Sequence, residues 1–334
     1  MKCYNRKIME KFYIICVTYK IEGLFAIVNS VLDHVIYARK NGYIPIVDLK
    51  HYYNQYFKDN RVFKDNVWEY FFEQPNGYAL GDLNENSQIT LSLNCQSIDN
   101  GNVIWNSEIP KDSNSKNPKL IERKNSYKNL LKFNQQTQKY LDEKFADFIG
   151  NGDDVLGILC RGTDYTKKRS LGEFIQPKTK SIIKKAKQII KKYPEIKRIY
   201  VATEDIQIYQ DLKKEFGDML IENNQYKFSY DENDKRYLSE IQIKRENHNY
   251  NLAKEYLLSI YVLSKCRYFI GGRTTGTKWA WILSDNWKYF YIWNLGRYGK
   301  TIKEKIFSKT TTIKDSKPYE VIQILGIKIR KNQK

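Results

Sequence analysis

The sequence predicts an α/β protein built on parallel sheets, and three observations lead to that prediction. Short runs that are almost wholly apolar, such as residues 155–159 and 268–271, are typical of strands buried on both faces of a sheet. Stretches with apolar residues at helical spacing alternate with these runs along the chain. Charged and hydroxyl residues follow several runs directly, and the carboxyl ends of parallel strands share one edge, where ligands bind.

The amino-terminal half opens with a strand, a helix and a second strand. Residues 13–18 predict the first strand, residues 24–40 a helix that Asn41-Gly42 ends, and residues 44–48 the second strand. This order is the beginning of a right-handed parallel unit. Gly23 at the first strand-to-helix junction would let a ligand approach the backbone, although a single glycine there also suits an ordinary turn.

The region after this unit is less regular. Residues 51–78 are rich in Tyr, Phe and Trp, which predicts core packing, with a sugar-stacking groove as the alternative. Residues 82–117 predict loops with short strands at 89–93 and 103–105.

A helical pattern at 127–148 leads into Gly150-Asn-Gly-Asp153, which is the predicted hinge of the chain. We therefore expect an N-terminal domain at 1–150 and a C-terminal domain at 151–334.

The C-terminal half alternates strands and helices more clearly. Residues 181–193 carry isoleucines on one face and lysines on the other, which predicts a surface helix whose lysines are solvated. Residues 223–249 predict a polar loop that contains His248. The other predicted strands are 198–203, 268–271 and 289–293, and the other predicted helices are 206–216, 252–265 and 277–283. From residue 314 a basic tail alternates Ile with Lys and Arg, and it either docks on the fold or contacts an anionic membrane.

Composition sets broad limits on the class of protein. The chain has 334 residues, 41% of them hydrophobic, and a formal net charge of +19. This length supports two domains of ordinary size or one large one. The charge suits nucleic acid, an anionic membrane or a phosphorylated substrate, and does not choose among them.

Cysteine and histidine usage predicts neither disulfides nor a metal site. The five cysteines are isolated from one another and the three histidines form no metal-binding motif, which is typical of reduced thiols in a cytosolic protein without a metal. The apolar run at 13–17 is too short to span a bilayer and lacks the layout of a signal peptide.

Polar residues follow three predicted strands of the C-terminal half: Arg161-Gly-Thr-Asp164, Thr203-Glu-Asp205 and Arg273-Thr-Thr-Gly276. Each has a simple structural explanation as an ion pair, a helix cap or a tight turn. In a parallel sheet all three open on the same edge, so they can converge on one ligand. An arginine and a glycine-rich helix start are suited to a phosphate.

These motifs, with Glu22-Gly-Leu-Phe-Ala-Ile-Val-Asn-Ser-Val31 near the amino terminus, occur in an order that resembles the fucosyltransferase superfamily. That superfamily includes α-1,6- and α-1,2-fucosyltransferases and protein O-fucosyltransferases. The resemblance covers the C-terminal half well, and the N-terminal half mainly through its first strand, loop and helix.

The resemblance implies the GT-B fold, in which two Rossmann-like domains with parallel sheets face a central cleft, the N-terminal one on the acceptor side. It implies an inverting transfer, without a metal or other cofactor, from a GDP-sugar, usually GDP-fucose, to a glycan or lipid-linked glycan of a surface polysaccharide pathway. It implies no nucleic-acid partner. The expected location is the cytoplasm, with peripheral association at the inner face of the membrane left open.

Residue roles carry over by position. Arg161 matches the arginine that binds the donor's β-phosphate and is the expected catalytic residue. Thr203, Glu204 and Asp205 fall on a motif whose acid contacts the nucleoside, and Thr274 and Thr275 match hydroxyl residues that hold the diphosphate. Asp164 and Arg273 complete the predicted nucleotide-sugar site, and Gly23 and Leu24 fall in a loop that faces the donor.

The chain also departs from the pattern. Leu159 stands where many members have a histidine, and Gly162 where some have a second arginine, which leaves the sugar and the acceptor open. Asp33, His34, Asp164 and Glu173 are the candidates for a general base, each with a structural role as the alternative. The linkage and the oligomeric state are left open too.

Three other functions remain as alternatives. The first is a GT-B transferase that uses another nucleotide sugar, since transferases for different nucleotide sugars share the recognition of the diphosphate but not that of the sugar. The second is a basic nucleic-acid-binding protein, which predicts lysines and aromatics clustered on one face and binding that weakens steeply with salt. The third is a noncatalytic carbohydrate-binding protein.

Overall fold

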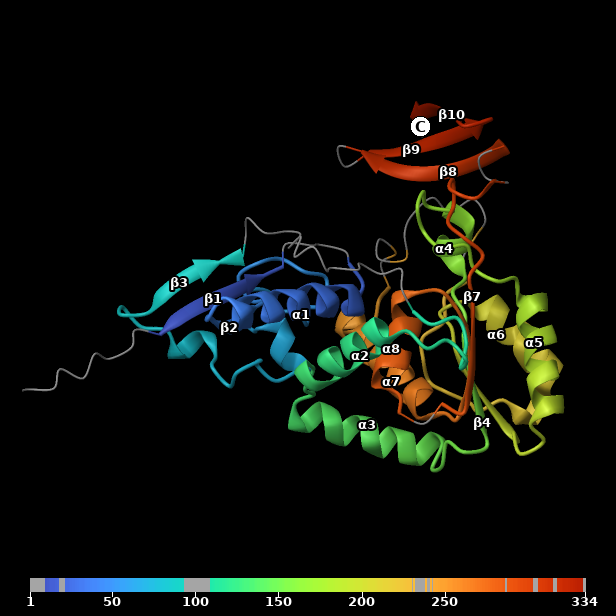
Figure 1. Cartoon of the computed structure of the whole chain (residues 1–334), viewed down its shortest axis with the longest axis horizontal. Helices are drawn as coiled ribbons and strands as arrows, with labels where there is room; N and C mark the ends of the chain where they lie inside the picture. The colour runs from blue at the N-terminus through green and yellow to red at the C-terminus, as the bar shows by residue number, and fades with distance from the viewer. Residues whose placement is uncertain are drawn as a thin grey trace, which may run out of the picture. The chain divides into compact units, whose positions relative to one another are not determined.

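The computed structural model of the chain describes residues 10–17, 22–92, 109–229, 231, 238, 241, 243–285, 287–302, 306–314 and 317–332. Figure 1 shows the helices and strands along the chain. The chain divides into two compact units. Unit 1 consists of Met1–Glu108, Pro118–Glu143 and Lys244–Lys254, and unit 2 of Ile109–Asn117, Lys144–Ile243 and Glu255–Lys334. Each unit contains a parallel sheet, so the predicted α/β class is confirmed.

Unit 1 is built on the strand–helix–strand segment at its start. β1 (Lys11–Cys16) and β2 (Ile44–Asp48) pair in parallel and are joined by α1 (Leu24–Lys40), whose bounds agree with the predicted helix. β3 (Gln88–Leu91) pairs in parallel with the other side of β1, which gives the order β2-β1-β3. The predicted strand at 103–105 lies outside the described residues.

The aromatic stretch at 51–78 contributes mainly to the core of unit 1. Phe57, Trp68, Phe71 and Phe72 are buried, and two short 3-10 helices, η1 (Val67–Tyr70) and η2 (Leu80–Asp82), lie in or just after this stretch.

The helical pattern predicted at 127–148 falls on two helices, the end of α2 (Pro118–Leu130) and the whole of α3 (Gln135–Phe148). Asn134 separates them, since its side-chain oxygen accepts the Thr137 amide at 2.8 Å and so caps α3.

Unit 2 contains a four-stranded parallel sheet in the order β5-β4-β6-β7. Its strands are β4 (Val155–Leu159), β5 (Arg198–Ala202), β6 (Tyr268–Gly272) and β7 (Tyr289–Trp293). Its helices are α4 (Thr163–Lys168), α5 (Thr179–Lys192), α6 (Ile206–Phe216), the 3-10 turn η4 (Gly217–Met219), α7 (His248–Lys265) and α8 (Thr275–Leu283).

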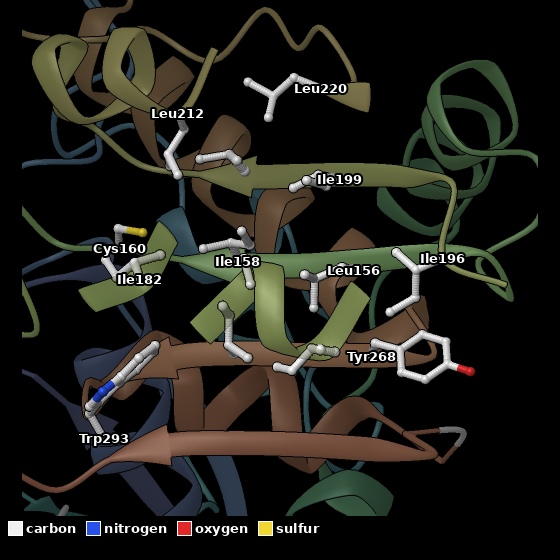
Figure 2. Close-up of a cluster of buried hydrophobic side chains, with 14 residues drawn as sticks. Leu156, Ile158, Cys160, Ile182, Ile196, Ile199, Leu212, Leu220, Tyr268 and Trp293 are labelled. Carbon is white, nitrogen blue, oxygen red and sulfur yellow. The ribbon is translucent and has the colours of Figure 1, made fainter. Parts of the chain in front are cut away.

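Helices cover both faces of this sheet. Ile182 of α5 and Leu212 of α6 pack with Leu156 and Ile158 of β4 on one face, as Figure 2 shows. Ile189 of α5 belongs to the same cluster. On the other face α7 approaches the sheet so closely that a Cβ at Gly157 would lie 2.8 Å from Leu263. Strands covered on both faces are apolar throughout, which is why they could be predicted from their sequence.

The topology of this sheet defines a switch point. From β4 the chain crosses by α5 to β5 on one side, whereas from β6 it crosses by α8 to β7 on the other side. α8 lies beside α7, since a Cβ at Gly276 would be 3.0 Å from Ile260, so the two crossover helices cover opposite faces. Sheets of this kind bind ligands beyond the carboxyl ends of the two strands at the switch point, here β4 and β6.

Two predicted loop boundaries need correction. The polar turn after β4 continues into α4 from Thr163, and α7 begins at His248, so His248 lies in a helix and not in the loop predicted at 223–249.

A third sheet was not predicted. The C-terminal residues form β8 (Phe307–Lys314), β9 (Lys317–Ile324) and β10 (Ile327–Asn332), paired in the antiparallel order β10-β9-β8. Within the described residues, no helix is both long and apolar enough to cross a membrane.

Candidate functional site

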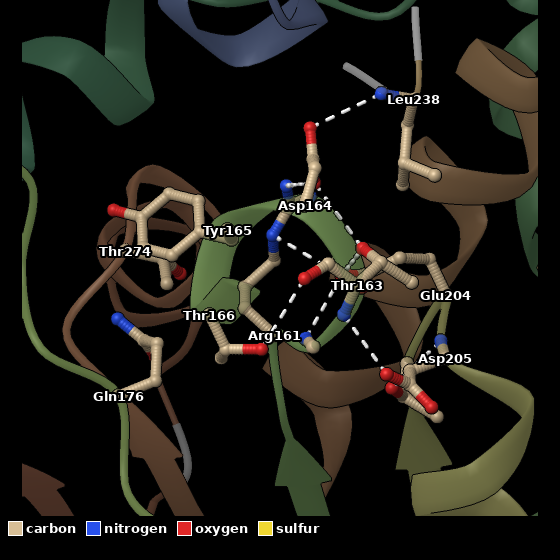
Figure 3. A network of polar contacts seen from close by, with 12 residues as sticks. Arg161, Thr163, Asp164, Tyr165, Thr166, Gln176, Glu204, Asp205, Leu238 and Thr274 are labelled. Carbon is tan, nitrogen blue, oxygen red and sulfur yellow. Dashed lines mark hydrogen bonds and ion pairs between the residues drawn. The ribbon is translucent and has the colours of Figure 1, made fainter. Parts of the chain in front are cut away.

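Arg161 lies just beyond the end of β4, at the switch point of the sheet in unit 2. Its guanidinium group lies between two carboxylates, with Nε 3.4 Å from Glu204 Oε1 and Nη2 3.8 Å from Asp164 Oδ1. The group also lies over the Tyr165 ring, with Cζ 5.1 Å from the ring centroid, and Figure 3 shows this arrangement. The Nε atom has no hydrogen-bond partner among the described residues, and the side chain is 30% exposed. The cation is thus oriented but incompletely satisfied, which suits an anionic ligand.

Electrostatics keep Arg161 charged. Burial alone would lower its pKa, but Glu204 and Asp164 offset this effect and raise the pKa above its ordinary value. The positive charge at the end of β4 is therefore permanent.

The acids after β5 hold the turn that carries Arg161. Glu204 Oε1 accepts the Gly162 amide at 3.0 Å, and Asp205 Oδ2 accepts the Thr163 amide at 2.9 Å. Asp205 Oδ1 caps α6 by accepting the amides of Gln207 and Ile208. Because these backbone donors are engaged within the protein, the side chain of Arg161 is the group on this turn that can bind an anion.

Thr203 and Gly162 serve the same turn. Thr203 is buried, and its hydroxyl oxygen accepts the Asp205 amide at 3.2 Å. Gly162 has no space for a side chain, since a Cβ there would overlap the Asp205 carboxylate and lie 2.6 Å from the Asp205 Cβ. Asp205 therefore occupies the space that a second arginine at position 162, as in some family members, would need.

The start of α8 lies at the end of β6, beside the β4 turn. Thr274 is its N-cap, and its hydroxyl oxygen accepts the Thr277 amide at 3.1 Å. The Thr277 hydroxyl donates to the Gly272 carbonyl at 2.6 Å. The amides of Thr275 and Gly276 are first-turn donors without an acceptor in the described part of the chain. They and the helix dipole favour a negative charge at this point.

Two side chains at this edge were missed by the sequence analysis. A Cβ at Gly276 would overlap the hydroxyl of Tyr256 on α7, so this phenol lies against the first turn of α8. Burial raises the Tyr256 pKa to about 12, with Arg161 opposing and Glu204 reinforcing the effect, so the phenol remains a hydrogen-bond donor.

Gln176 is the second. It is 6% exposed and donates from Nε2 to the Arg273 carbonyl at 3.1 Å, while its Oε1 has no partner within the described residues. In Figure 3 it lies close to Thr274. Its position in a loop before α5 offers no pattern by which the sequence could have marked it.

Arg273 is oriented by stacking. Its guanidinium carbon lies 5.0 Å from the centroid of the Phe174 ring, and that of Arg297 lies 3.8 Å from the same ring. Unit 2 thus brings together Arg161, Asp164, Thr203, Glu204, Asp205, Arg273, Thr274 and Thr275 at the carboxyl edge of one sheet.

Gly23 and Leu24 belong to unit 1. They follow β1, the central strand of its sheet, which has β2 on one side and β3 on the other. Gly23 starts α1 and has open space around its α-carbon, whereas Leu24 is buried. Gly23 therefore ends the loop after the first strand, whereas Leu24 is the first residue of α1 and not part of the predicted loop.

The four candidates for a general base all have structural partners. Asp33 accepts the Tyr127 hydroxyl and lies 3.7 Å from Arg123, and His34 is buried against Tyr13, whose hydroxyl is 3.0 Å from Nδ1.

The other two candidates lie in unit 2. Asp164 accepts the Leu238 amide at 3.1 Å, and Glu173 accepts the Tyr165 hydroxyl at 2.6 Å. None of the four is singled out as a base by these contacts.

Metal-binding groups are not gathered at the site. No cluster of three or more His, Cys, Asp or Glu suited to a metal ion occurs in the described ranges. Cys160, beside Arg161, is buried, and burial raises the pKa of its thiol, so it is inert as a nucleophile.

No family model and no curated protein sequence matches the chain. Among solved structures it is similar to the fucosyltransferase NodZ from Bradyrhizobium, with 12% identity and a TM-score of 0.44 over 83% of this chain and 94% of that one. It is similar to a variant of Arabidopsis thaliana FUT1 in complex with GDP, with 11% identity and a TM-score of 0.44 over 87% and 72% of the two chains. It is also similar to POFUT1 in complex with GDP-fucose, with 10% identity and a TM-score of 0.42 over 84% and 97%.

Proposed function

We propose that this protein is a glycosyltransferase that transfers a sugar, most simply fucose from GDP-fucose, to a glycan or lipid-linked glycan acceptor. The observation that carries the proposal is the place of Arg161, a permanent cation without a full set of partners, at the switch point beside the uncapped amides of α8. The order of the strand-end motifs, which resembles that of the fucosyltransferase superfamily, supports the same activity.

In the proposed complex the diphosphate lies between Arg161 and the start of α8. The guanidinium fork binds the β-phosphate, and the amides of Thr275 and Gly276 donate to the same group. Glu204 and Asp164 hold the fork in place, and Tyr256 donates from the α7 side.

The proposed reaction is a displacement at the anomeric carbon. The bond between this carbon and the β-phosphate oxygen breaks, and the bonding electrons leave with GDP. The acceptor oxygen forms the new bond from the opposite face, so the configuration inverts, and its proton passes to a base or to water. Arg161 and α8 neutralise the charge that grows on the phosphate, a task that a bound metal performs in other transferases.

The proposal has two further parts. The GT-B arrangement would place Gly23 and Leu24 on the donor's other side. The buried, isolated thiols of Cys16, Cys160 and Cys266 support a reducing, cytoplasmic location.

Nucleotide-induced stabilisation tests the proposal. GDP, UDP, CMP and ADP are added in turn to the protein, without metal, and thermal unfolding is followed. Ligand at a hundred times its Kd stabilises a fold by about 2.7 kcal/mol, which is an easily measured shift. We expect a shift with GDP. A shift with another nucleotide alone would favour a GT-B transferase for a different sugar, and no shift with any of them would contradict the proposal. GDP binding without transfer would favour a carbohydrate-binding protein.

Nucleic-acid binding is the second candidate, and one observation favours it. A groove of about 850 Å³ between α5 and α6 is lined by five lysines and two acids: Lys180, Lys184, Lys187, Lys191, Lys214, Asp211 and Glu215. Tyrosine rings of β7 lie near other lysines of α5, with Lys185 Nζ 4.2 Å from the centroid of Tyr291. Duplex and single-stranded DNA therefore belong in the same thermal assay, and a salt-sensitive shift with DNA alone would support this alternative.

A further inference from the structure

The C-terminal sheet of unit 2 exposes an unusual amount of apolar surface. Seven large apolar side chains between residues 302 and 329 are 45–82% exposed: Ile302, Ile306, Phe307, Ile324, Leu325, Ile327 and Ile329. Figure 1 shows β8, β9 and β10 side by side in this sheet. Ile302 and Ile306 precede the sheet, and the other five lie in it or in its β9–β10 turn. A soluble surface normally carries such residues singly, so the concentration of these five indicates a binding surface.

The strand register places these side chains on one face. Ile324 of β9 lies opposite Phe307 of β8 and Ile327 of β10, and residues directly opposite one another share a face of an antiparallel sheet. In the next row on that face, Ile322 lies opposite Lys309 and Ile329. We call these six residues the outer face, and Leu325 lies in the adjoining turn.

The opposite face of the sheet packs on the protein. Ser308, Thr310, Val321 and Gln323 are only 1–3% exposed. Thr311 ties the sheet to the segment after α4, because its carbonyl accepts the Leu171 amide at 2.8 Å. Since the sheet is held from this side, the outer face is directed to solvent.

The segment that carries the apolar surface is rich in basic residues. Residues 300–334 contain ten Lys or Arg against three Asp or Glu, a higher basic fraction than the chain as a whole. Lys309 on the outer face is exposed and pairs with Glu320 at 2.8 Å. Lys328 and Arg330 are exposed on the edge strand β10, where they lie opposite Gln323 and Val321 and so belong to the other face. An apolar face on a basic segment matches the interface of an anionic membrane, where apolar side chains enter the acyl boundary and nearby cations meet lipid phosphates.

We propose that the outer face and the Leu325 turn dock this protein on an anionic lipid surface. Pairing with a second copy through the β10 edge is disfavoured, because Lys328 and Arg330 lie on that strand and charges of this kind oppose edge-to-edge pairing. The contact is separate from the proposed reaction, so it is measured without donor or acceptor.

The test is co-sedimentation of the full chain with vesicles of phosphatidylcholine alone and of phosphatidylcholine mixed with phosphatidylglycerol. We expect binding to the mixed vesicles that weakens as salt is raised. Replacing Leu325 and Ile327 by Asp should weaken binding by about tenfold or more, since each buried aliphatic side chain contributes at least that order of partitioning. A control on β3, Ile89→Asp, changes a residue that is also 46% exposed and should leave binding unchanged.

A charge-matched pair of variants separates local from general attraction. Lys309→Glu on the outer face should reduce binding to the mixed vesicles by about fivefold or more, because each cation near the surface contributes about fivefold. Lys184→Glu on α5 changes the net charge equally, at an exposed position, and should have a much smaller effect.

Each of three results would overturn the proposal. They are no binding to either vesicle, equal loss in both charge-reversal variants, and a dimer by light scattering that disappears in the Leu325 and Ile327 variant while vesicle binding persists. The last would assign the outer face to contacts between copies.

Discussion

The Nε atom of Arg161 lies 3.4 Å from Glu204 Oε1 without forming a hydrogen bond. The carboxylate therefore supplies charge compensation and orientation, but makes no hydrogen bond to this donor. An arginine in this state binds a phosphate without first breaking a strong internal bond, which lowers the cost of ligand binding.

We expect Arg161→Lys to lose most of the GDP-induced thermal shift, and transferase activity with it. Lysine retains the charge but not the planar fork that makes two parallel hydrogen bonds. Loss of one such transition-state contact costs roughly a hundredfold or more in rate. The shift with saturating GDP and the initial transfer rate are the measurements.

Arg198 provides a matched control on the same sheet. It pairs with Asp154 through two hydrogen bonds at the amino end of β5, away from the switch point. Arg198→Lys should lower the melting temperature and keep the full response to GDP. If Arg161→Lys keeps a response within about twofold of wild type in affinity, well under 1 kcal/mol, Arg161 does not bind the phosphate.

Tyr256→Phe should weaken GDP binding without unfolding the protein. The change removes the hydroxyl beside Gly276 and leaves the ring, so packing between α7 and α8 is retained. Loss of one hydrogen bond to a charged group is worth about 1.5–3 kcal/mol. Isothermal titration with GDP measures the loss, and Tyr261→Phe, on the same helix, should bind as wild type does.

Gly162→Ala should destabilise the fold by about 1–3 kcal/mol through overpacking. The added methyl group meets the Asp205 carboxylate, which cannot move away without giving up the Thr163 amide and the α6 cap. Urea unfolding measures the change. Gly81→Ala, where no atom lies within 4 Å of the added carbon, is the control and should have little effect.

The parallel sheets could be predicted because strands covered on both faces carry uninterrupted apolar residues. The convergence of the Arg161, Glu204 and Thr274 segments followed from the same inference, since parallel strands place their carboxyl ends on one edge. The sequence could not predict that Glu204 and Asp205 accept the amides of Gly162 and Thr163, because the two pairs follow different strands and are far apart in the chain.

Features that depend on packing between distant segments could not be predicted from the sequence. Tyr256 has an ordinary place in the helical pattern of α7, and only the approach of α8 gives its hydroxyl a role. The sequence of the β8–β10 sheet predicts only a basic tail, because β10 alternates Ile and Lys with both kinds of residue exposed. Such a strand has no continuous apolar run to mark it.

Acid pH should weaken the fold through Asp154. The hydrogen bonds from Arg198, opposed by partial burial, lower the Asp154 pKa below its ordinary value. A carboxyl group whose pKa is lower in the folded state stabilises the fold above its unfolded pKa, about 3.9, and this contribution is lost as pH falls through the folded value. The free-energy gap between wild type and Asp154→Asn should therefore be constant from about pH 7 to about pH 5 and shrink below about pH 4. Urea unfolding at fixed ionic strength measures this gap.

Glu143→Gln is the control, because it removes a carboxylate from an exposed pair with Lys139 at 3.8 Å. The difference in unfolding free energy between wild type and Glu143→Gln should be small at every pH. A gap for Asp154→Asn that stays constant to about pH 2.5 would show that the Arg198 pair contributes through its geometry and not through the charge of Asp154.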